Sequence, residues 1–89
     1  MAPARAEILE ILASHAGQPV DYLALYMFLN TVAGGHYQER YGAEEIEREL
    51  RELLHAGAIE AWQGERRLPL QDVSIMPGGS PCHFRLARG

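Results

Sequence analysis

The hydrophobic pattern of this chain changes its period at Gly57, and that change determines the fold class. Before this glycine, apolar residues recur at the spacing of one buried helix face: Ile46, Leu50, Leu53 and Leu54. After it, over residues 59–62, apolar and polar residues alternate with the two-residue period of a strand. We therefore expect a helix over roughly residues 43–56 that leads directly into a strand, in a chain of α+β class.

Two more helices are predicted nearer the N-terminus. Pro3 suits the first position of a helix, apolar residues then recur at helical spacing, and Gly17 supplies a stop. We therefore expect a first helix over roughly residues 3–15. After a short extended link, Asp21 is a good N-cap because its carboxylate can accept from the exposed amides of the next turn. A second helix should begin there.

The second helix is unusual because it has no polar face. Residues 22–29 form an unbroken apolar run, and a small domain with one core can hardly cover every side of such a helix. An uncovered part would form the kind of apolar patch that marks a protein interface. We therefore predict a protein-binding or self-associating surface that includes these side chains: Tyr22, Leu25, Tyr26, Met27 and Phe28.

The alternative is that the second helix lies at the centre of the core. The segment over residues 31–42, rich in glycine and polar residues, is predicted to be a loop. It carries Tyr37 and Tyr41, which could fold across the outer side of the helix. Both interpretations stay open at the level of the sequence.

The C-terminal third predicts a β-hairpin. Apolar and polar residues alternate over residues 73–75 and again over residues 83–86, and a turn sequence rich in proline and glycine, residues 77–81, separates them. Residues 64–71 should connect the strand at 59–62 to this hairpin. The predicted architecture is thus three helices followed by a small antiparallel sheet.

Length and composition predict one cytoplasmic domain. A chain of 89 residues supports a single core, so we expect one domain over residues 1–89. Its single cysteine, Cys82, excludes an intramolecular disulfide and suits a reducing compartment. The N-terminus lacks the pattern of a signal peptide, and the longest apolar run, residues 22–29, is too short to span a bilayer.

The element order resembles a winged helix-turn-helix domain. The likeness covers nearly the whole chain and is strongest over residues 45–62, where the third helix runs through Gly57 into the first wing strand. It implies a β-hairpin wing that touches the DNA backbone, a third helix that enters the major groove, and dimers that read two half-sites. The connection over residues 31–42 departs from the family, whose usual turn is much shorter.

The third helix, however, is acidic on its exposed face. That face carries five glutamates against Arg48 and Arg51: Glu44, Glu45, Glu47, Glu49 and Glu52. Duplex DNA presents a dense row of phosphates and would be repelled by such a face. Two interpretations stay open: an ordinary solvated face with Glu–Arg pairs at helical spacing, or a surface that mimics nucleic acid in a partner's binding groove.

The last third of the chain offers a different nucleic-acid surface. Residues 1–61 hold ten acidic residues against four arginines, whereas residues 62–89 hold two against four. These four arginines could bind DNA phosphates from the wing: Arg66, Arg67, Arg85 and Arg88. The alternative is that they are scattered over the surface and share no face.

The sequence predicts neither a metal site nor an active site. The histidines and Cys82 show no ligand spacing such as Cys-x-x-Cys or His-x-x-x-His, and Cys82 and His83 would point to opposite faces of a strand. The serines lie in no nucleophile elbow, and no glycine-rich phosphate loop precedes a helix. We therefore expect no enzyme, no cofactor and no small-molecule substrate.

These patterns together predict a non-catalytic, regulatory winged-helix module that binds a protein partner, or a second copy of itself, through its second helix. The alternative is a DNA-binding transcriptional regulator that contacts phosphates through the wing arginines. A further alternative is the acidic nucleic-acid mimic. None of these functions involves a membrane.

Overall fold

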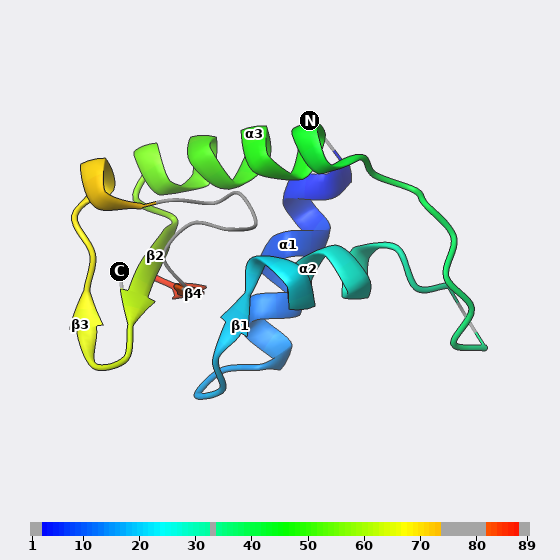
Figure 1. Ribbon diagram of the computed structural model, residues 1–89, viewed down its shortest axis with the longest axis horizontal. Helices are drawn as coiled ribbons and strands as arrows, with labels where there is room; N and C mark the ends of the chain where they lie inside the picture. The colour runs from blue at the N-terminus through cyan, green and yellow to red at the C-terminus, as the bar shows by residue number, and fades with distance from the viewer. Residues whose placement is uncertain (1–2, 33, 74–81, 88–89) are drawn as a thin grey trace.

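The computed structural model describes residues 3–32, 34–73 and 82–87 of the chain. Within them the protein is α+β, with three α-helices and one antiparallel sheet of four strands. The elements follow one another in this order: α1 (Pro3–Ser14), β1 (Val20–Asp21), α2 (Tyr22–Leu29), α3 (Ala43–His55), β2 (Ile59–Gln63), β3 (Arg66–Arg67), the 3-10 helix η1 (Leu70–Asp72) and β4 (His83–Leu86). Figure 1 shows α3 lying across α1, with the sheet at one end of the molecule.

The three predicted helices are confirmed, with boundaries within a residue or two of those expected. Asp21 caps α2 as predicted, because its Oδ1 accepts from the amide of Ala24 at 2.8 Å. Gly17 and Gly57, the two predicted stops, have φ angles of 86° and 74°. Glycine adopts this left-handed backbone without a steric cost, so the chain can leave each helix sharply.

The predicted hairpin partner of the last strand is wrong. β4 lies between β1 and β2 and is antiparallel to both, so both of its edges are occupied. Val73 is the C-cap residue that directly follows η1. The turn predicted over residues 77–81 lies outside the described residues. The sheet also contains two short strands that the sequence did not predict: β1 pairs with β4, and β3 pairs with β2.

The core lies between the helices and one face of the sheet. α1 packs against α2, α3 and β4, while α3 packs against β2. In the register, Ala61 faces Phe84 and Ile59 faces Leu86, so these side chains share the inner face. The largest fully buried side chains come from every layer: Phe84, Ile8, Leu25, Leu29, Ile46, Leu50 and Asn30.

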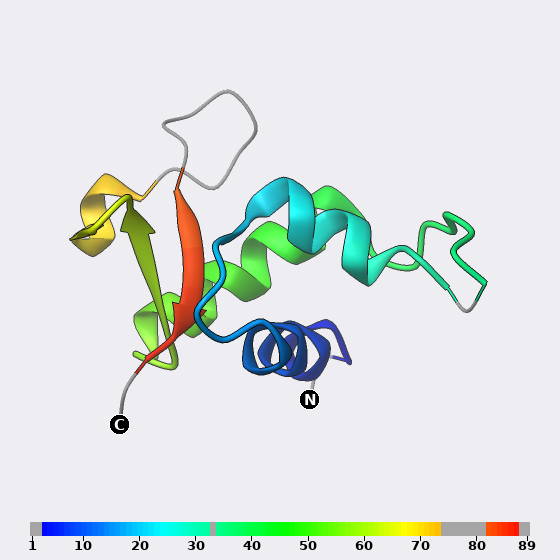
Figure 2. The same cartoon turned by 90° about the horizontal axis from the view of Figure 1, so that it is seen from below.

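The segment between α2 and α3 is a loop, as predicted. Figure 2 shows that residues 34–42 extend from the helical part of the molecule, at the end away from the sheet. The segment returns to the core at Tyr41, whose side chain is buried. In the described part of the chain, no helix combines the length and apolar character needed to cross a membrane.

Candidate interaction surfaces

The outer face of α2 is apolar and exposed. Leu23 is 66 % exposed, and Met27 and Phe28 are each 44 % exposed. Leu23 and Met27 lie four residues apart, so they stand one above the other on one side of the helix, and Phe28 lies beside them. We call these three side chains the outer stripe. An uncovered apolar group of this kind on a helix with no polar face is a feature of partner surfaces.

The structure divides the five residues predicted for the α2 interface. Leu25 is fully buried and Tyr22 nearly so, because both belong to the hydrophobic core. They lie on the core face of α2 rather than on its exposed face, which corrects the prediction for these two residues. Tyr26 is half-buried at the flank, while Met27 and Phe28 belong to the outer stripe.

Leu23 was missed, although helical spacing could have found it. It lies four residues before Met27, on the side of α2 opposite the buried Leu25 and Leu29. Every residue of the run 22–29 is apolar, so composition alone does not distinguish its faces. Assigning the residues of the run to helix faces by their spacing separates a core face from an outer face.

The loop after α2 covers only one flank of that helix. The hydroxyl groups of Tyr26 and Tyr37 are 2.9 Å apart, and the two rings stack with centroids 6.4 Å apart. Tyr37 nevertheless stays 53 % exposed. The alternative in which the loop hides the outer side of α2 therefore does not hold for the outer stripe.

On the opposite flank, Phe28 leans toward α1. Its ring stacks on the imidazole of His15, with the centroids 4.8 Å apart. A depression of about 340 Å³ lies beside this pair, between α1, α2 and Arg40. The outer stripe thus has an aromatic contact on each side: Tyr26 with Tyr37 on one, and Phe28 with His15 on the other.

The outer face of the sheet carries a second cluster, of different chemistry. Trp62 faces His83 and Glu60 faces Arg85 across the β2–β4 pair, and Arg67 faces Trp62 across the β2–β3 pair. The guanidinium carbon of Arg85 lies 4.1 Å from the centroid of the Trp62 ring, a cation–π contact. These five side chains form what we call the tryptophan cluster.

Hydrogen bonds and an ion pair order the tryptophan cluster. The Trp62 indole N–H donates to Oε1 of Glu60 at 3.1 Å, and Oε2 of Glu60 lies 3.6 Å from Nη1 of Arg67. Arg85 Nη2 and His83 Nε2 are 3.2 Å apart. Burial, followed by the charge of Arg85, lowers the pKa of His83, so its neutral ring can accept from Arg85.

The structure brings together two of the four arginines predicted to bind nucleic acid. Arg67 and Arg85 both belong to the tryptophan cluster. Arg66 precedes Arg67 in β3, and because side chains alternate along a strand it points to the other face. Arg88 lies outside the described residues.

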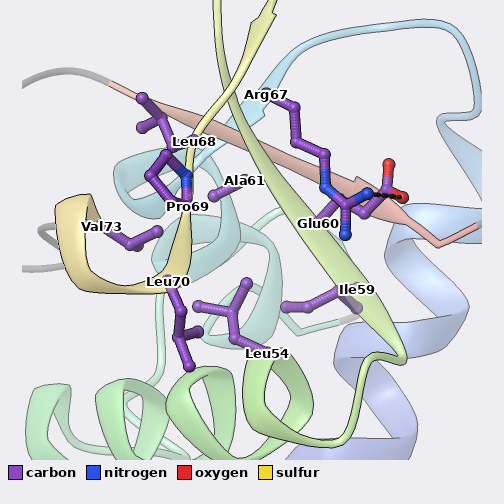
Figure 3. A pocket seen from close by; sticks show the side chains of 9 residues that line it. All are labelled: Leu54, Ile59, Glu60, Ala61, Arg67, Leu68, Pro69, Leu70 and Val73. Carbon is purple, nitrogen blue, oxygen red and sulfur yellow. Dashed lines mark ion pairs between the residues drawn. The ribbon is translucent and has the colours of Figure 1, made fainter.

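A third surface feature is apolar and lies between α3 and the segment around η1. It is a depression of about 340 Å³ whose walls include Leu54, Leu68, Leu70 and Val73. Figure 3 shows Leu54 and Leu70 close together at its lower end, with the Glu60–Arg67 ion pair on the far side of β2. Leu70 is 42 % exposed.

The acidic face of α3 is less acidic than the sequence suggested. Glu49 was expected on that face, but it is only 2 % exposed and pairs with Arg5 of α1. Glu47 pairs with Arg51 at 3.0 Å, one helical turn away. Glu44 stays exposed near the N-terminus of α3, where the helix dipole favours an acidic residue.

Over residues 3–32, 34–73 and 82–87, no three histidine, cysteine, aspartate or glutamate side chains gather where they could hold a metal ion.

No protein-family model, no curated protein and no solved structure matches this chain.

Proposed function

We propose that this protein is a non-catalytic interaction module of winged-helix type that forms a homodimer through the outer stripe of α2. A short strand, β1, follows α1, and the other three strands follow α3, in an antiparallel sheet in which β2 and β4 are neighbours; this order supports the winged-helix assignment. The observation that carries the function is the exposure of Leu23, Met27 and Phe28 on a helix without charge.

A second copy fits this surface because the surface is uncharged. The chain has a formal net charge of −4, so two copies repel one another. The repulsion is weakest when they meet through surfaces that carry no charged side chains. Residues 22–35 contain no charged side chain. In a two-fold dimer the same patch serves both partners, and antiparallel α2 helices would set Leu23 of one copy against Met27 of the other.

The solution mass tests this proposal. Light scattering of the wild-type chain over a range of concentrations should give twice the mass of one chain. Leu23→Glu places a charge in the centre of the contact and should give a monomer, since an unpaired buried charge costs several kcal/mol, on the order of 3–5. A dimer held by apolar contact should persist as salt is raised.

The matched control is Leu70→Glu. It makes the same change at another exposed leucine, on η1 rather than α2, and should leave the dimer intact. Circular dichroism would establish that both variants fold. A wild-type chain that stays monomeric at the highest concentration, or a Leu23→Glu variant that remains dimeric, overturns the proposal.

Duplex DNA remains the weaker alternative. Of the three predicted arginines that the structure describes, Arg67 and Arg85 share a face and Arg66 does not, and the exposed glutamates of α3 would oppose entry into a groove. The same light-scattering experiment with random duplex DNA added tests it. A larger mass that disappears as salt rises would favour the DNA-binding function.

A further inference from the structure

The tryptophan cluster lies in a depression large enough for a small ligand. The depression measures about 590 Å³ and is lined by residues of β2, β3 and β4 together with the C-terminal part of α1 and the residues that follow it. Cavities that bind small molecules span roughly 300–1,000 Å³. Its lining combines charged and aromatic side chains with apolar ones: Glu60, Trp62, Arg67, Arg85, Leu12, Ala16, Gly17 and Leu86.

Arg85 and Trp62 together offer a stacking surface. The guanidinium group lies over the indole ring at 4.1 Å, and Arg85 also borders a smaller neighbouring depression of about 190 Å³ with Gly17 and Pro19. Arg85 therefore lines both depressions. Nucleobases that are not paired in a duplex stack on aromatic rings and on guanidinium planes.

Arg67 supplies an anion-binding group beside that surface. Its side chain is 64 % exposed, and its ion-pair distance to Glu60 is 3.6 Å, which is longer than a hydrogen bond. Its N–H donors therefore remain available to a second anion, and their fork geometry matches a phosphate. Arg66 cannot join in, because it points to the other face of β3.

Glu60 adds a hydrogen-bond acceptor to the lining of the site. Its side chain is only 14 % exposed, and Trp62 holds one of its oxygens through the indole N–H. A carboxylate placed here would repel a phosphate set directly against it, and would accept from an amino group such as those on nucleobases. Because Glu60 lies 3.6 Å from Nη1 of Arg67, a phosphate bound by Arg67 must approach the side of the guanidinium group that faces away from Glu60. The base is assigned to Arg85 by the stack of that residue on Trp62.

We propose that this depression binds a single nucleotide whose base is unpaired, with the base stacked on the Arg85–Trp62 pair and the phosphate held by Arg67. The nucleotide is either free or the accessible unit of a single strand, since both present the same chemistry. Duplex DNA does not fit, because its bases are stacked inside the helix. This inference does not depend on the dimer proposed for α2.

The fluorescence of Trp62 reports directly on the site, because Trp62 is the only tryptophan in the chain. Adenosine monophosphate should quench it in a saturable way. Adenosine alone and inorganic phosphate alone should each bind at least about tenfold more weakly than adenosine monophosphate, since each makes one of the two contacts. A short single-stranded oligonucleotide, titrated at low and high salt, distinguishes the two sources. Tighter, salt-sensitive binding identifies a strand, and equal affinity identifies the free nucleotide.

Three variants test the assignment of the residues. Arg67→Gln should weaken nucleotide binding about tenfold, as expected for the loss of a charge-assisted contact. Arg66→Gln removes the same charge from the neighbouring position on the other face and should change nothing. Arg85→Lys keeps the charge but removes the guanidinium plane, so it should weaken adenosine binding more than phosphate binding.

The proposal is overturned by any of three results. The first is that none of the probes quenches Trp62. The second is that Arg66→Gln and Arg67→Gln weaken binding alike, which would indicate unspecific attraction to charge. The third is that inorganic phosphate binds as well as the nucleotide, which would leave an anion site with no role for stacking. Leu23→Glu should bind the nucleotide as the wild type does, so failure here is separable from failure of the dimer.

Discussion

Arg5 of α1 donates from Nε to Oε1 of Glu49 of α3 at 2.9 Å, and this pair places an acidic side chain in the interface between the two helices. The Glu49 side chain is 3 % exposed and the Arg5 side chain 38 % exposed. Arg5 also pairs with Glu52, and Arg48 approaches Glu49 at 3.8 Å. The pair joins the first helix to the third, across 44 residues of sequence.

Removing Arg5 should destabilise the protein. Arg5→Met leaves the buried Glu49 carboxylate with Arg48, at 3.8 Å, as its remaining ion-pair partner among the described residues. We expect a loss of about 2 kcal/mol in the free energy of unfolding, measured in urea. Arg51→Met is the matched control, because Arg51 pairs with Glu47 at an exposed site and should cost less than about 0.5 kcal/mol. Equal losses for the two variants would contradict a special role for the buried pair.

Asn30 anchors the loop between α2 and α3. It is fully buried. Its Oδ1 accepts from the amides of Arg40 and Tyr41, at 2.6 and 2.9 Å, while its Nδ2 donates to the carbonyl of Tyr26. One side chain thus satisfies three backbone groups where the long loop returns to the core.

Asn30→Leu keeps the approximate size but leaves the amides of Arg40 and Tyr41 without this acceptor, while the carbonyl of Tyr26 still accepts from the backbone amide of residue 30. We expect a loss of about 2–3 kcal/mol in stability and faster hydrogen exchange at the amides of Arg40 and Tyr41. Gln38→Ala is the control, because Gln38 enters the described hydrogen bonds only through its backbone amide. Unchanged exchange in Asn30→Leu would show that the loop is held by other contacts.

The helices could be predicted because their signals are local. The Asp21 cap, the apolar stripe of α3 and the stop at Gly57 each depend on residues within a few positions of one another. The pairing of β4 with both β1 and β2 could not be predicted, since it depends on contacts between distant segments. β3 was missed because its two residues, Arg66 and Arg67, carry no strand pattern.

The same distinction applies to the surfaces. An apolar outer face of α2 follows from composition alone, although which side chains form it depends on helical period. The tryptophan cluster depends on the register that sets Trp62 opposite both His83 and Arg67. A shift of one residue would send these side chains to opposite faces, and nothing near Trp62 in the sequence specifies that register.

The tyrosines predict a loss of stability at high pH. A hydrogen bond with Tyr37, followed by burial, raises the pKa of Tyr26 from 10.0 to about 12, and burial raises the pKa of Tyr22. A raised pKa in the folded state means that folding favours the protonated phenol. The resulting contribution to stability is complete below pH 10 and is lost as the pH rises toward 12.

Phenolate absorbance during an alkaline titration measures this effect. In Tyr37→Phe the largest cause of the shift is gone, so Tyr26 should titrate closer to its ordinary pKa of 10.0. Tyr22→Phe should leave the titration of Tyr26 in place. It should not destabilise the fold, because the buried Tyr22 hydroxyl has no hydrogen-bond partner among the described residues. An unchanged titration in Tyr37→Phe would contradict the assigned cause.

Two glycines at opposite ends of α3 should respond differently to substitution. Gly57 has a φ of 74°, whereas Gly42, the N-cap, has a φ of −76°. No atom lies within 4 Å of a Cβ built at either position, so the backbone alone decides the outcome. Gly57→Ala should therefore destabilise the protein by about 1–2 kcal/mol, the cost of a left-handed conformation for a residue with a Cβ.

Gly42→Ser should instead stabilise the protein by about 0.5–1 kcal/mol. Serine restricts the unfolded chain, and its hydroxyl can accept from the first turn of α3, which has no side-chain cap in this structure. Urea unfolding of the two variants gives both numbers. Neither site touches a neighbour, so the two variants should differ. If Gly42→Ser destabilised the protein as much as Gly57→Ala does, α3 would not begin where the structure places it.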